Sequence, residues 1–431
     1  MRVVSISSLE ELERLRPRPG PAVTGAKYDS RRITPGDVFF ALPGKHAHGI
    51  QFADEALARG ATFVISDQPH PTGTVVSDPA TYLLKLGQQS RNTRTGAVIG
   101  VTGSVGKTTT KDLLAAAISA YASPGNRNTP LAHATELISM EAKRIPTKPI
   151  VLELGIDHIG EMKVLVDLVR PTHGIITALA TAHLDGLKNL ATITAEKTLL
   201  LEASSDSFAD IEAAKYLPSS VRKRTTTYGL EGEGADFEPP FFIDRAGHPV
   251  LKLGASYRLP GIGRTFARNA AGALAIAKAL NIHIVEAAAR MVHMKLSPSR
   301  LQIIRSDNLT IIDDSYNSSP ASLVAALEVL LASNKPTTAV LGDMLELGTS
   351  ADDLHCSFSK SAMTINRLVT VGEKAALIAP NHPNAIRALN TEEAIEVLAN
   401  LDLKGTILVK ASRGMHFERI ITALTSTKRR S

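Results

Sequence analysis

Glycine-rich residues 100–110, with the lysine among them, are the part of this sequence whose chemistry is clearest. They read Gly-Val-Thr-Gly-Ser-Val-Gly-Lys-Thr-Thr-Thr, between an apolar run and a stretch of helix length. Glycines let backbone N–H groups converge on phosphate oxygens, and the following helix adds the positive end of its dipole. Lys107 would reach the terminal phosphates, and Thr108 could bind Mg²⁺. The predicted phosphate contacts are Thr102, Gly103, Ser104, Gly106, Lys107, Thr108 and Thr109.

The spacing of this segment departs from the simple GxxxxGK[ST] pattern. Val101 stands five residues before Gly106, so Gly103 carries the turn instead. An ordinary glycine-rich turn is the alternative interpretation. A Gly-Lys pair followed by three threonines, placed between a strand and a helix, favours phosphate binding over that alternative.

Two further side chains could serve metal ions at the same place. Glu153 lies in the apolar run 149–155, and His183 follows the next run, 174–180. The carboxyl ends of parallel strands meet at one edge of a sheet, so both should lie near the phosphate loop. A strand-end acid can also be paired with a neighbouring base, and a lone histidine is more often structural than a ligand. The sequence favours Glu153 as a magnesium ligand and leaves His183 open.

The elements that must position these residues follow the pattern of an α/β fold. Apolar runs at 61–67, 97–103, 149–155 and 174–180 are separated by helical stretches, which indicates parallel sheets covered on both faces. Segment 229–262 loses this rhythm and predicts short antiparallel strands inserted at the sheet edge. Beyond it, five more apolar runs, each separated from the next by a stretch of helix length, predict a further α/β domain: 301–305, 309–314, 337–343, 367–372 and 406–412.

The length of 431 residues requires more than one domain, because single cores rarely exceed about 250–300 residues. A Ser-Pro-Ser sequence at 297–299 is typical of a hinge. We therefore expect domains at 1–94, 95–297 and 298–431.

Composition narrows the possible partners and surroundings. The net charge of +6 comes from 48 basic and 42 acidic residues, a mixed surface that disfavours nucleic acid and suits a small anionic substrate. Cys356 is the only cysteine, so an internal disulfide is excluded and a reducing cytoplasm is expected. Residues 1–17 lack the apolar core of an export signal, and no run reaches the ~18 apolar residues of a membrane span.

The sequence resembles the Mur ligases over essentially its whole length. The uridine-nucleotide module of that family is similar to residues 28–61. Two motifs, DDSYN (313–317) and LGDMLELG (341–348), are together more specific for this family than the phosphate loop, which many NTPases share. The remaining motifs follow in family order: TGSVGKTTTKD (102–112), GNRN (125–128), ELGIDHIGEM (153–162), AHLDG (182–186), AEKTLLLE (195–202), RNAAGALA (268–275), SRLQII (299–304), DDSYNSSPASLVAAL (313–327), LGDMLELG (341–348) and VKASRGMHFE (409–418).

The resemblance implies three domains: a small α/β module that binds a uridine nucleotide, a central P-loop ATPase with a parallel sheet, and a C-terminal Rossmann-like domain. It also implies a cytoplasmic, ATP-dependent ligase of peptidoglycan precursor synthesis, expected to be a monomer. ATP would phosphorylate a carboxylate of a UDP-N-acetylmuramoyl tripeptide, and the amine of D-alanyl-D-alanine would attack the acyl phosphate. Since a carboxylate is a poor acyl acceptor, a phosphate leaving group suits this chemistry.

Roles at the nucleotide and metal sites follow from the resemblance, position by position. Lys107, His183, Lys197 and Arg300 are the expected catalytic residues. Asn269, at the start of a helix, would read adenine, although a helix N-cap is a compatible alternative. Arg300, Asp314 and Tyr316 would reach ATP when the domains close about the hinge. Two Mg²⁺ ions are expected, held by Thr108, Glu153, His183 and a carbamoylated Lys197, which without the resemblance would be a surface lysine.

The expected substrate residues come from three places in the chain. Ser30, Arg31, Lys45 and His48 would bind the nucleotide sugar, Asn126 and Asn128 the acceptor, and Lys410, Ser412 and Arg413 the incoming dipeptide. The sequence departs from the family pattern after GNRN, where residues 129–135 read TPLAHAT, and also at Ser318-Ser319-Pro320 and in KASRG. These departures concern the identity of the acceptor peptide and of the amine more than the nucleotide chemistry.

Two alternatives stay open. The first is another ligase of the superfamily, of the folylpolyglutamate type or adding a diamino acid. The former lacks the uridine module, and the latter usually carries an Asn-Pro-Arg motif that this sequence does not contain. The second is a nucleotide-binding scaffold without catalysis, against which Lys107, Glu153, His183 and Lys197 argue.

Overall fold

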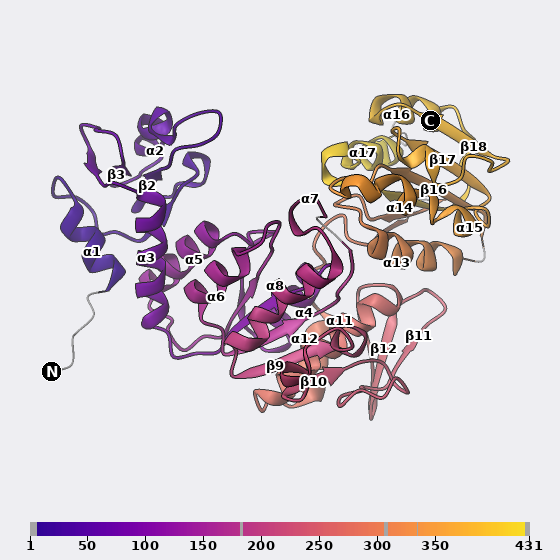
Figure 1. Ribbon diagram of the computed structural model, residues 1–431, viewed down its shortest axis with the longest axis horizontal. Coiled ribbons are helices and arrows are strands. Elements are labelled where there is room, and N and C mark those ends of the chain that lie inside the picture. Colours follow the sequence, from indigo (N-terminus) through magenta and orange to yellow (C-terminus); the bar gives the residue numbers. More distant parts are fainter. Residues whose placement is uncertain (1–6, 182–183, 306–308, 334, 427–431) are drawn as a thin grey trace.

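The computed structural model describes residues 7–181, 184–305, 309–333 and 335–426. Three α/β units follow one another along the long axis, and the N- and C-terminal units lie at opposite ends (Figure 1). The predicted α/β fold with parallel sheets is confirmed. Within the described ranges, no helix has both the length and the apolar character needed to cross a membrane.

The first unit is built on a four-stranded parallel sheet of order β1-β2-β3-β4. The strand expected at 61–67 is confirmed as β3, although it is shorter. Its elements are α1 (Ser8–Leu15), β1 (Gly25–Lys27), β2 (Asp37–Ala41), α2 (Ala53–Ala58), β3 (Val64–Ser66), β4 (Gly73–Val75) and α3 (Pro79–Asn92).

The central unit contains a six-stranded, wholly parallel sheet of order β10-β9-β8-β5-β7-β6. The three strands expected here are confirmed as β5, β7 and β8, whereas β6, β9 and β10 were not predicted. The strands are β5 (Val98–Thr102), β6 (Tyr121–Ala122), β7 (Ile150–Glu153), β8 (His173–Ile176), β9 (Asp206–Asp210) and β10 (Thr225–Tyr228). The helices are α4 (Lys107–Ala117), α5 (Pro130–Ala142), α6 (Glu161–Val169), α7 (Leu184–Leu187), α8 (Leu190–Ala203), α9 (Ile211–Ala214), α10 (Ser219–Arg222), α11 (Gly263–Ala279) and α12 (Ile284–Val292).

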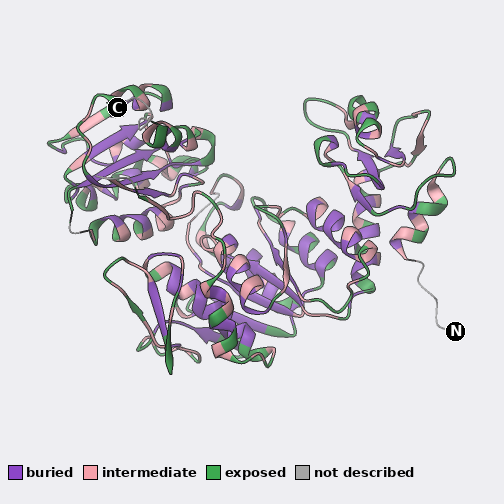
Figure 2. Cartoon of the chain, turned by 180° about the vertical axis from the view of Figure 1, so that it is seen from behind, coloured by how far each residue is buried: buried purple, intermediate pink, exposed green. Residues whose placement is uncertain are grey.

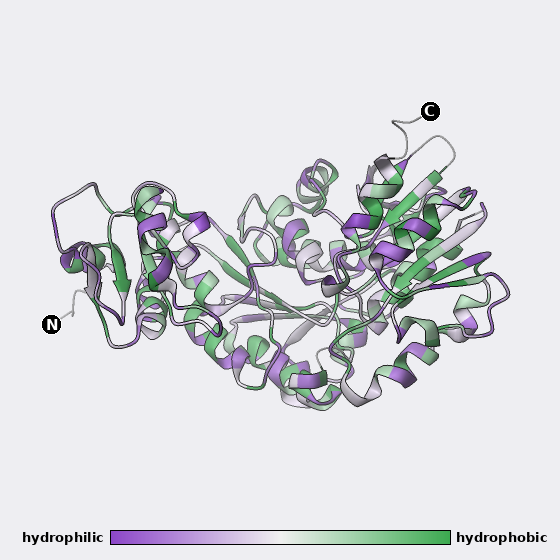
Figure 3. Cartoon of the chain, turned by 90° about the horizontal axis from the view of Figure 1, so that it is seen from above, coloured by the Kyte–Doolittle hydropathy of each residue, from purple (hydrophilic) through white to green (hydrophobic). Residues whose placement is uncertain are grey.

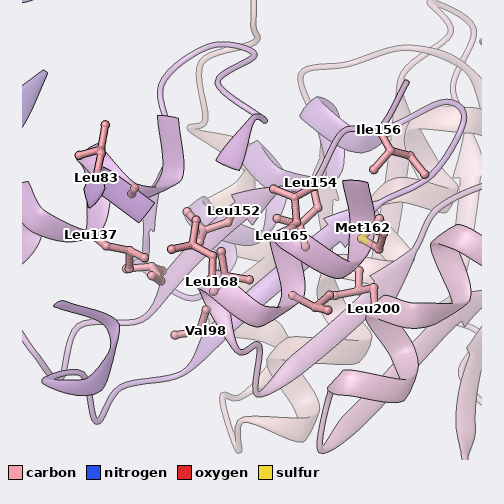
Figure 4. Packing of buried hydrophobic residues seen from close by; sticks show 14 of the residues in the cluster. Leu83, Val98, Leu137, Leu152, Leu154, Ile156, Met162, Leu165, Leu168 and Leu200 are labelled. Carbon is pink, nitrogen blue, oxygen red and sulfur yellow. The ribbon is translucent and has the colours of Figure 1, made fainter. Parts of the chain in front are cut away.

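Alternation along the central strands explains why both faces of this sheet are apolar. Val98 packs with α5, α6 and α8, whereas its neighbour Ile99 faces the other way, toward α4, α11 and α12. Figure 4 shows the first of these layers, with Leu152 of β7 beside Leu165 and Leu168 of α6. Buried strands between helices with exposed outer faces are visible in Figure 2, and the same strands are hydrophobic in Figure 3.

The segment predicted to contain short antiparallel strands forms a separate three-stranded sheet, which confirms that prediction. Its strands pair in sequence order, β11-β12-β13, and both pairings are antiparallel. The strands are β11 (Phe241–Ile243), β12 (Pro249–Leu253) and β13 (Ala255–Arg258).

The last unit is a six-stranded sheet of order β14-β15-β19-β16-β17-β18. A helix was expected between its first two strands, and that expectation is wrong: β14 and β15 pair antiparallel, and residues 306–308 between them are too few for a helix. β18 was not predicted. The strands are β14 (Gln302–Arg305), β15 (Leu309–Asp313), β16 (Thr337–Gly342), β17 (Arg367–Val371), β18 (Ala385–Ala388) and β19 (Gly405–Lys410). The helices are α13 (Pro320–Leu331), α14 (Ala351–Cys356), α15 (Ser359–Ala362), α16 (Thr391–Ala399) and α17 (Glu418–Ser426).

The first two units share one hydrophobic core. A single cluster of buried residues contains Phe40 and Leu86 on one side of the predicted boundary at residue 94, and Leu137 and Leu152 on the other. The last unit has most of its buried apolar residues in two clusters of its own. The boundaries at 94/95 and 297/298 stay predictions.

Gly87 allows α3 and α5 to meet closely inside this shared core. A Cβ atom at Gly87 would lie 2.7 Å from both Cα and Cβ of Ala134. Alanine in mid-helix normally stabilises by about 0.5–1 kcal/mol over glycine, so a loss of stability would report the steric clash. We expect Gly87→Ala to lower the free energy of unfolding by about 1–3 kcal/mol, measured by chemical denaturation.

The matched control is Gln88→Ala, on the exposed side of the same helix, which should change stability by less than about 0.5 kcal/mol. A Gly87→Ala protein as stable as the wild type would show that the two helices can separate without loss.

Candidate active site

The phosphate loop is shaped by two glycines that no other residue could replace. Gly103 follows β5 with φ of +152°, and a Cβ atom there would collide with Thr177 Oγ1. Gly106 has φ of +88°, and its Cβ would lie 2.6 Å from Asn269 Oδ1. Helix α4 begins at the next residue, Lys107, whose Nζ donates to the carbonyl oxygen of Gly103 at 2.9 Å. The loop and helix start therefore have the form that phosphate binding requires.

Thr108 and Glu153 meet beneath this loop. Thr108 lies in the first turn of α4, which follows β5, and Glu153 ends the neighbouring strand β7, where it pairs with Val101 of β5. Both side chains are buried. The Thr108 hydroxyl donates to Glu153 Oε2 at 2.6 Å. A hydroxyl and a carboxylate are oxygen donors of the kind that Mg²⁺ prefers, and phosphates and waters would complete such a site.

The predicted ligand His183 lies outside the described residues, so it cannot be placed relative to this site. Among the residues that the structure does describe, no group of three or more His, Cys, Asp and Glu side chains is arranged to hold a metal ion. The pair formed by Thr108 and Glu153 fits one Mg²⁺, and the expected second ion stays a prediction.

Lys197 is buried in helix α8, with an exposed fraction of 3%. A surface position, which its sequence alone favoured, is therefore wrong. Burial lowers the pKa of Lys197 well below the ordinary lysine value, and the positive charge of Lys107 lowers it further. A larger share of this side chain is consequently the neutral amine, which is the form that reacts with carbon dioxide.

Asn269 does not open its helix, contrary to the expectation from sequence. Helix α11 begins at Gly263, so Asn269 lies in its second turn and is buried. Its amide oxygen cannot cap the helix start from there. Instead the side chain packs against Gly106 and lines the cavity above the phosphate loop.

A cavity of about 390 Å³ joins the central unit to the last one. Its central wall carries the phosphate loop, Glu153 and Asn269. Its C-terminal wall carries residues from helix α13 and from four separate segments, 300–301, 314–319, 345–347 and 410–414. The predicted site residues that line it are Ser104, Gly106, Lys107, Thr108, Thr109, Asn126, Asn128, Glu153, Asn269, Arg300, Asp314, Tyr316, Lys410, Ser412 and Arg413. The structure thus brings together predicted residues that lie up to about 300 positions apart in the sequence.

Positive charge gathers in this cavity. Burial lowers the pKa of Lys107, Glu153 opposes that effect, and the nearby charge of Arg300 adds to the lowering. Two cations near the phosphate loop would each be stabilised by an anion between them. The arrangement is suited to a polyphosphate.

Asp314 is held by a neighbour instead of pointing freely into the cavity. Lys410, whose side chain is almost fully buried, forms an ion pair with Asp314 and donates to the carbonyl oxygen of Asn317 at 2.8 Å. Burial raises the pKa of Asp314, while Lys410 acts in the opposite direction. The pair ties the end of β15 to the end of β19.

A second cavity of about 260 Å³ lies between the first and central units. Asn126 and Asn128 line both cavities, so the GNRN segment separates one from the other. Five residues of the second cavity were not among the predicted site residues: Lys27, Tyr28, Asp29, Arg32 and Arg127. Thr129, Ala132 and Thr135 also line it and belong to the segment after GNRN that was expected near the acceptor peptide. The available signals were the GNRN motif for Arg127 and the resemblance of residues 28–61 to the uridine-nucleotide module for Tyr28, Asp29 and Arg32.

The four residues expected to bind the nucleotide sugar do not line these two cavities, although Ser30 and Arg31 lie between Asp29 and Arg32 of the second. Ser30 is buried and donates to Glu55 at 3.1 Å. Arg31 is exposed and pairs with Asp29, and His48 Nε2 lies 2.9 Å from Asp67 Oδ1. Lys45 is exposed. None of the four lines either cavity, so their predicted role stays a prediction.

Two buried residues that the sequence reasoning missed support the site. Lys111 of α4 donates to the carbonyl oxygens of Ser123 and Gly125, which holds the loop before GNRN. His133 Nε2 lies 2.9 Å from the carbonyl oxygen of Glu153 and must carry the proton, because a carbonyl only accepts. Burial lowers the pKa of His133 to about 4, so the ring is neutral at pH 7. The segment that departs from the family pattern therefore still supports Glu153.

A phosphate loop on a parallel sheet, facing a cavity whose other wall is a second α/β unit, defines a nucleotide-dependent enzyme of the P-loop class. The comparisons with known proteins give the family. The chain belongs to the Mur ligase family: a model of the Mur ligase middle domain matches residues 101–277. Models described as "Mur ligase, glutamate ligase domain" and "Mur ligase family, catalytic domain" match residues 299–413 and 22–85.

The most similar relatives carry one name. A UDP-N-acetylmuramoyl-tripeptide--D-alanyl-D-alanine ligase of Bacillus subtilis is 29% identical over 429 residues, or 93% of each chain. One of Mycobacterium bovis is 30% identical over 84% of this chain and 80% of its own. A crystal structure of MurF from Acinetobacter baumannii superposes with a TM-score of 0.85 at 26% identity, over 97% of this chain and 98% of that one. The three-domain architecture implied by the resemblance is confirmed.

Lys107 can be tested directly, because its ammonium is the cation of the phosphate loop. We expect Lys107→Ala to keep less than a tenth of the wild-type turnover, a barrier increase above about 1.4 kcal/mol, with an unchanged circular dichroism spectrum. Turnover is measured as ADP release. Lys163→Ala, an exposed lysine on α6 paired with Asp167, is the matched control and should behave as wild type. Substantial turnover in the Lys107→Ala protein would remove this lysine from the mechanism.

Proposed function

We propose that the protein joins D-alanyl-D-alanine to a UDP-N-acetylmuramoyl tripeptide at the expense of ATP. The observation that carries the proposal is the first cavity, where the phosphate loop of one unit faces Arg300 and Arg413 of another. Asn126 and Asn128 connect that cavity to the second, at the first unit. The relatives from Bacillus subtilis and Mycobacterium bovis, which match 93% and 84% of this chain, bear the name of this activity.

The reaction follows from placing three charged reactants in adjoining cavities. The terminal phosphoryl group of ATP passes to the carboxylate of the acceptor peptide, and ADP leaves. The amine of the dipeptide then attacks the acyl carbon, the amide bond forms, and phosphate leaves while the amine loses a proton. Lys107 and Arg300 would neutralise the charge that accumulates when two anions are brought together. Closure of the two units about this cavity would limit access of water to the acyl phosphate.

Magnesium would be held by Thr108 and Glu153, whose oxygens already face each other. When bound, Mg²⁺ supplies charge neutralisation at the phosphates. The hydrogen bond between the two side chains fixes the carboxylate on the central side of the cavity. Glu153 therefore remains positioned near the phosphates whichever domain arrangement the ligands select.

Lys197 would be carbamoylated. Its neutral amine adds to the carbon of CO₂, a C–N bond forms, and one proton is released, so a neutral group becomes an anion. The buried position and the adjacent charge of Lys107 favour this product, because a carbamate attracts the ammonium that an unmodified Lys197 repels. An anionic oxygen ligand here would also suit the expected second Mg²⁺.

The experiment that tests the proposed function identifies the product. Purified protein, ATP and Mg²⁺ are incubated with UDP-N-acetylmuramoyl tripeptide and with either D-alanyl-D-alanine or single amino acids. The mass of the product is then measured by mass spectrometry. We expect the mass of the pentapeptide product, with ADP release that requires both acceptor and dipeptide. Product with a single amino acid, and none with the dipeptide, would assign another ligase activity to the same site.

That second ligase activity is the alternative that one observation favours. Thr129, Ala132 and Thr135, from the segment that departs from the family pattern, line the second cavity. A changed lining there alters which acceptor peptide fits, without touching the phosphate loop. Acceptors with different third residues therefore belong in the same assay. A scaffold without catalysis would release no ADP with any pair.

The carbamate on Lys197 gives a separate prediction. We expect Lys197→Ala to lose more than about nine tenths of turnover, equivalent to over ~1.4 kcal/mol, and to be partly restored by millimolar acetate or formate. A small carboxylate can occupy the space of the missing group and supply similar oxygens. Glu202→Ala, on the exposed side of the same helix, is the control. It should keep wild-type turnover both with and without acetate or formate. Normal turnover of Lys197→Ala in bicarbonate-free buffer would contradict the role of a carbamate.

A further inference from the structure

Tyr316 touches two arginines that come from different loops of the last unit. The guanidinium carbon of Arg300 lies 4.0 Å from the centre of the Tyr316 ring, and that of Arg413 lies 5.4 Å from it. Both distances fall within the range of a cation–π contact. One aromatic ring thus serves two cations that line the same cavity.

Arg300 is fixed to Tyr316 through the backbone as well. Its two neighbours, Ser299 and Leu301, both have left-handed backbone conformations, with φ of +57° and +51°. The Tyr316 N–H donates to the Ser299 carbonyl at 3.1 Å, and the Leu301 N–H donates to Asp314 Oδ1 at 3.1 Å. Such conformations are unfavourable for non-glycine residues and persist only where surrounding contacts hold them. Arg300 therefore moves with the last unit, although it stands beside the linker.

Arg413 reaches the same ring from the opposite end of the sequence of that unit. Its backbone N–H donates to Asn317 Oδ1 at 3.3 Å, next to Tyr316. The Arg413 side chain is 60% exposed, and its Nη1 atom lies 3.8 Å from Glu418 Oε2. This long ion pair at an exposed position holds the guanidinium only weakly. The Tyr316 ring is a further contact that holds the Arg413 side chain at the cavity.

Electrostatics indicates what the two arginines are for. Guanidinium groups that share one ring repel each other, and Lys107 adds a third positive charge on the other wall of the cavity. Anions between them would relieve this repulsion. A nucleotide phosphate is the anion at Arg300, which faces the phosphate loop. The C-terminal carboxylate of an incoming amino compound is the anion of matching size and geometry for Arg413.

We propose that Tyr316 is a positioning residue whose ring couples Arg300, at the nucleotide phosphates, to Arg413, at the carboxylate of the incoming dipeptide. The proposal rests on the proposed function and deepens it. When phosphate neutralises Arg300, repulsion across the ring falls and Arg413 is held more firmly at the cavity. Nucleotide binding then improves binding of the dipeptide, and by thermodynamic reciprocity the dipeptide improves binding of the nucleotide.

The test compares Tyr316→Leu, which removes the ring, with Tyr316→Phe, which keeps it. For Tyr316→Leu we expect the KM for the dipeptide to rise and kcat to fall, each by about two- to fivefold per lost contact. The KM for the UDP-linked acceptor, which reaches the second cavity, should stay unchanged. Tyr316→Phe should recover most of the loss. Tyr216→Leu, an exposed tyrosine of the central unit, is the control for loss of a ring.

The proposed coupling between nucleotide binding and dipeptide binding can be measured separately from turnover. The affinity for a non-hydrolysable ATP analogue is measured by calorimetry with and without the dipeptide, in wild type, Tyr316→Leu, Arg413→Ala and the double variant. The dipeptide should tighten analogue binding in the wild type and have little effect in the three variants, and the double variant should be no worse than Arg413→Ala.

The outcomes separate the two proposals. Wild type that forms no product with any amine contradicts the proposed function, whereas the comparison of variants in calorimetry still decides on Tyr316. Wild-type kinetics and coupling in Tyr316→Leu would overturn the coupling proposal. Equal defects in Tyr316→Phe and Tyr316→Leu would also overturn it, because they would assign the effect to the hydroxyl group.

Discussion

Close approach of the backbone at Gly103 and Gly106 is the constraint on which the rest of this site depends. Thr177, after β8, and Asn269, in α11, occupy the space that side chains at the two glycines would need. The loop can therefore exist only where β5, β8 and α11 converge. That convergence in turn sets the direction of α4 and places Thr108 against Glu153 of the neighbouring strand. The same steric requirement therefore sets the positions of the sheet, of helix α4 and of the phosphate loop.

Charge imposes a second requirement on the same place. Lys107, Lys197 and Arg300 lie close enough for each to perturb another, and burial of the two lysines makes their charged forms less favourable. Removing any one positive charge would ease folding but weaken the attraction for anions. The free protein thus holds unfavourable interactions that bound phosphate and carboxylate groups can relieve. This balance between stability and binding is common at sites that handle multiply charged substrates.

Much of this organisation could be predicted from the sequence, because apolar strands and the phosphate loop are local signals. β5, β7 and β8 were recognisable from buried runs, and Lys107 and Glu153 from their position after such runs. β9 was missed because its sequence, Asp-Ser-Phe-Ala-Asp, has little apolar character outside the sheet that buries it. The antiparallel pairing of β14 with β15 was missed because the two apolar runs carry no local signal for strand direction, which depends on how the strands meet in the sheet.

The site residues also divide into those that local sequence patterns indicate and those whose position depends on packing. Asn269 lies beside Gly106 of the phosphate loop, and its predicted role stays a prediction. Its predicted position in the helix was wrong, since α11 begins at Gly263, among residues with no strong start signal. The burial of Lys197 depends on which face of α8 meets the sheet, and the two-sided apolar pattern of that helix does not reveal it. The contact of Tyr316 with Arg413 joins loops nearly a hundred residues apart, which no local pattern encodes.

The continuous core between the first and central units also bears on how such a chain can be recombined. Leu86 and Leu137 belong to one packed cluster, so the first unit cannot be exchanged for that of a relative without mismatched side chains at α3 and α5. The last unit keeps most of its buried apolar residues in clusters of its own. Gene fusion or exchange at the linker would leave both partners with nearly complete interiors. The architecture therefore allows the last unit, which is proposed to meet the incoming amine, to diversify, while the first unit, which is proposed to hold the uridine-linked acceptor, is inherited together with the phosphate loop.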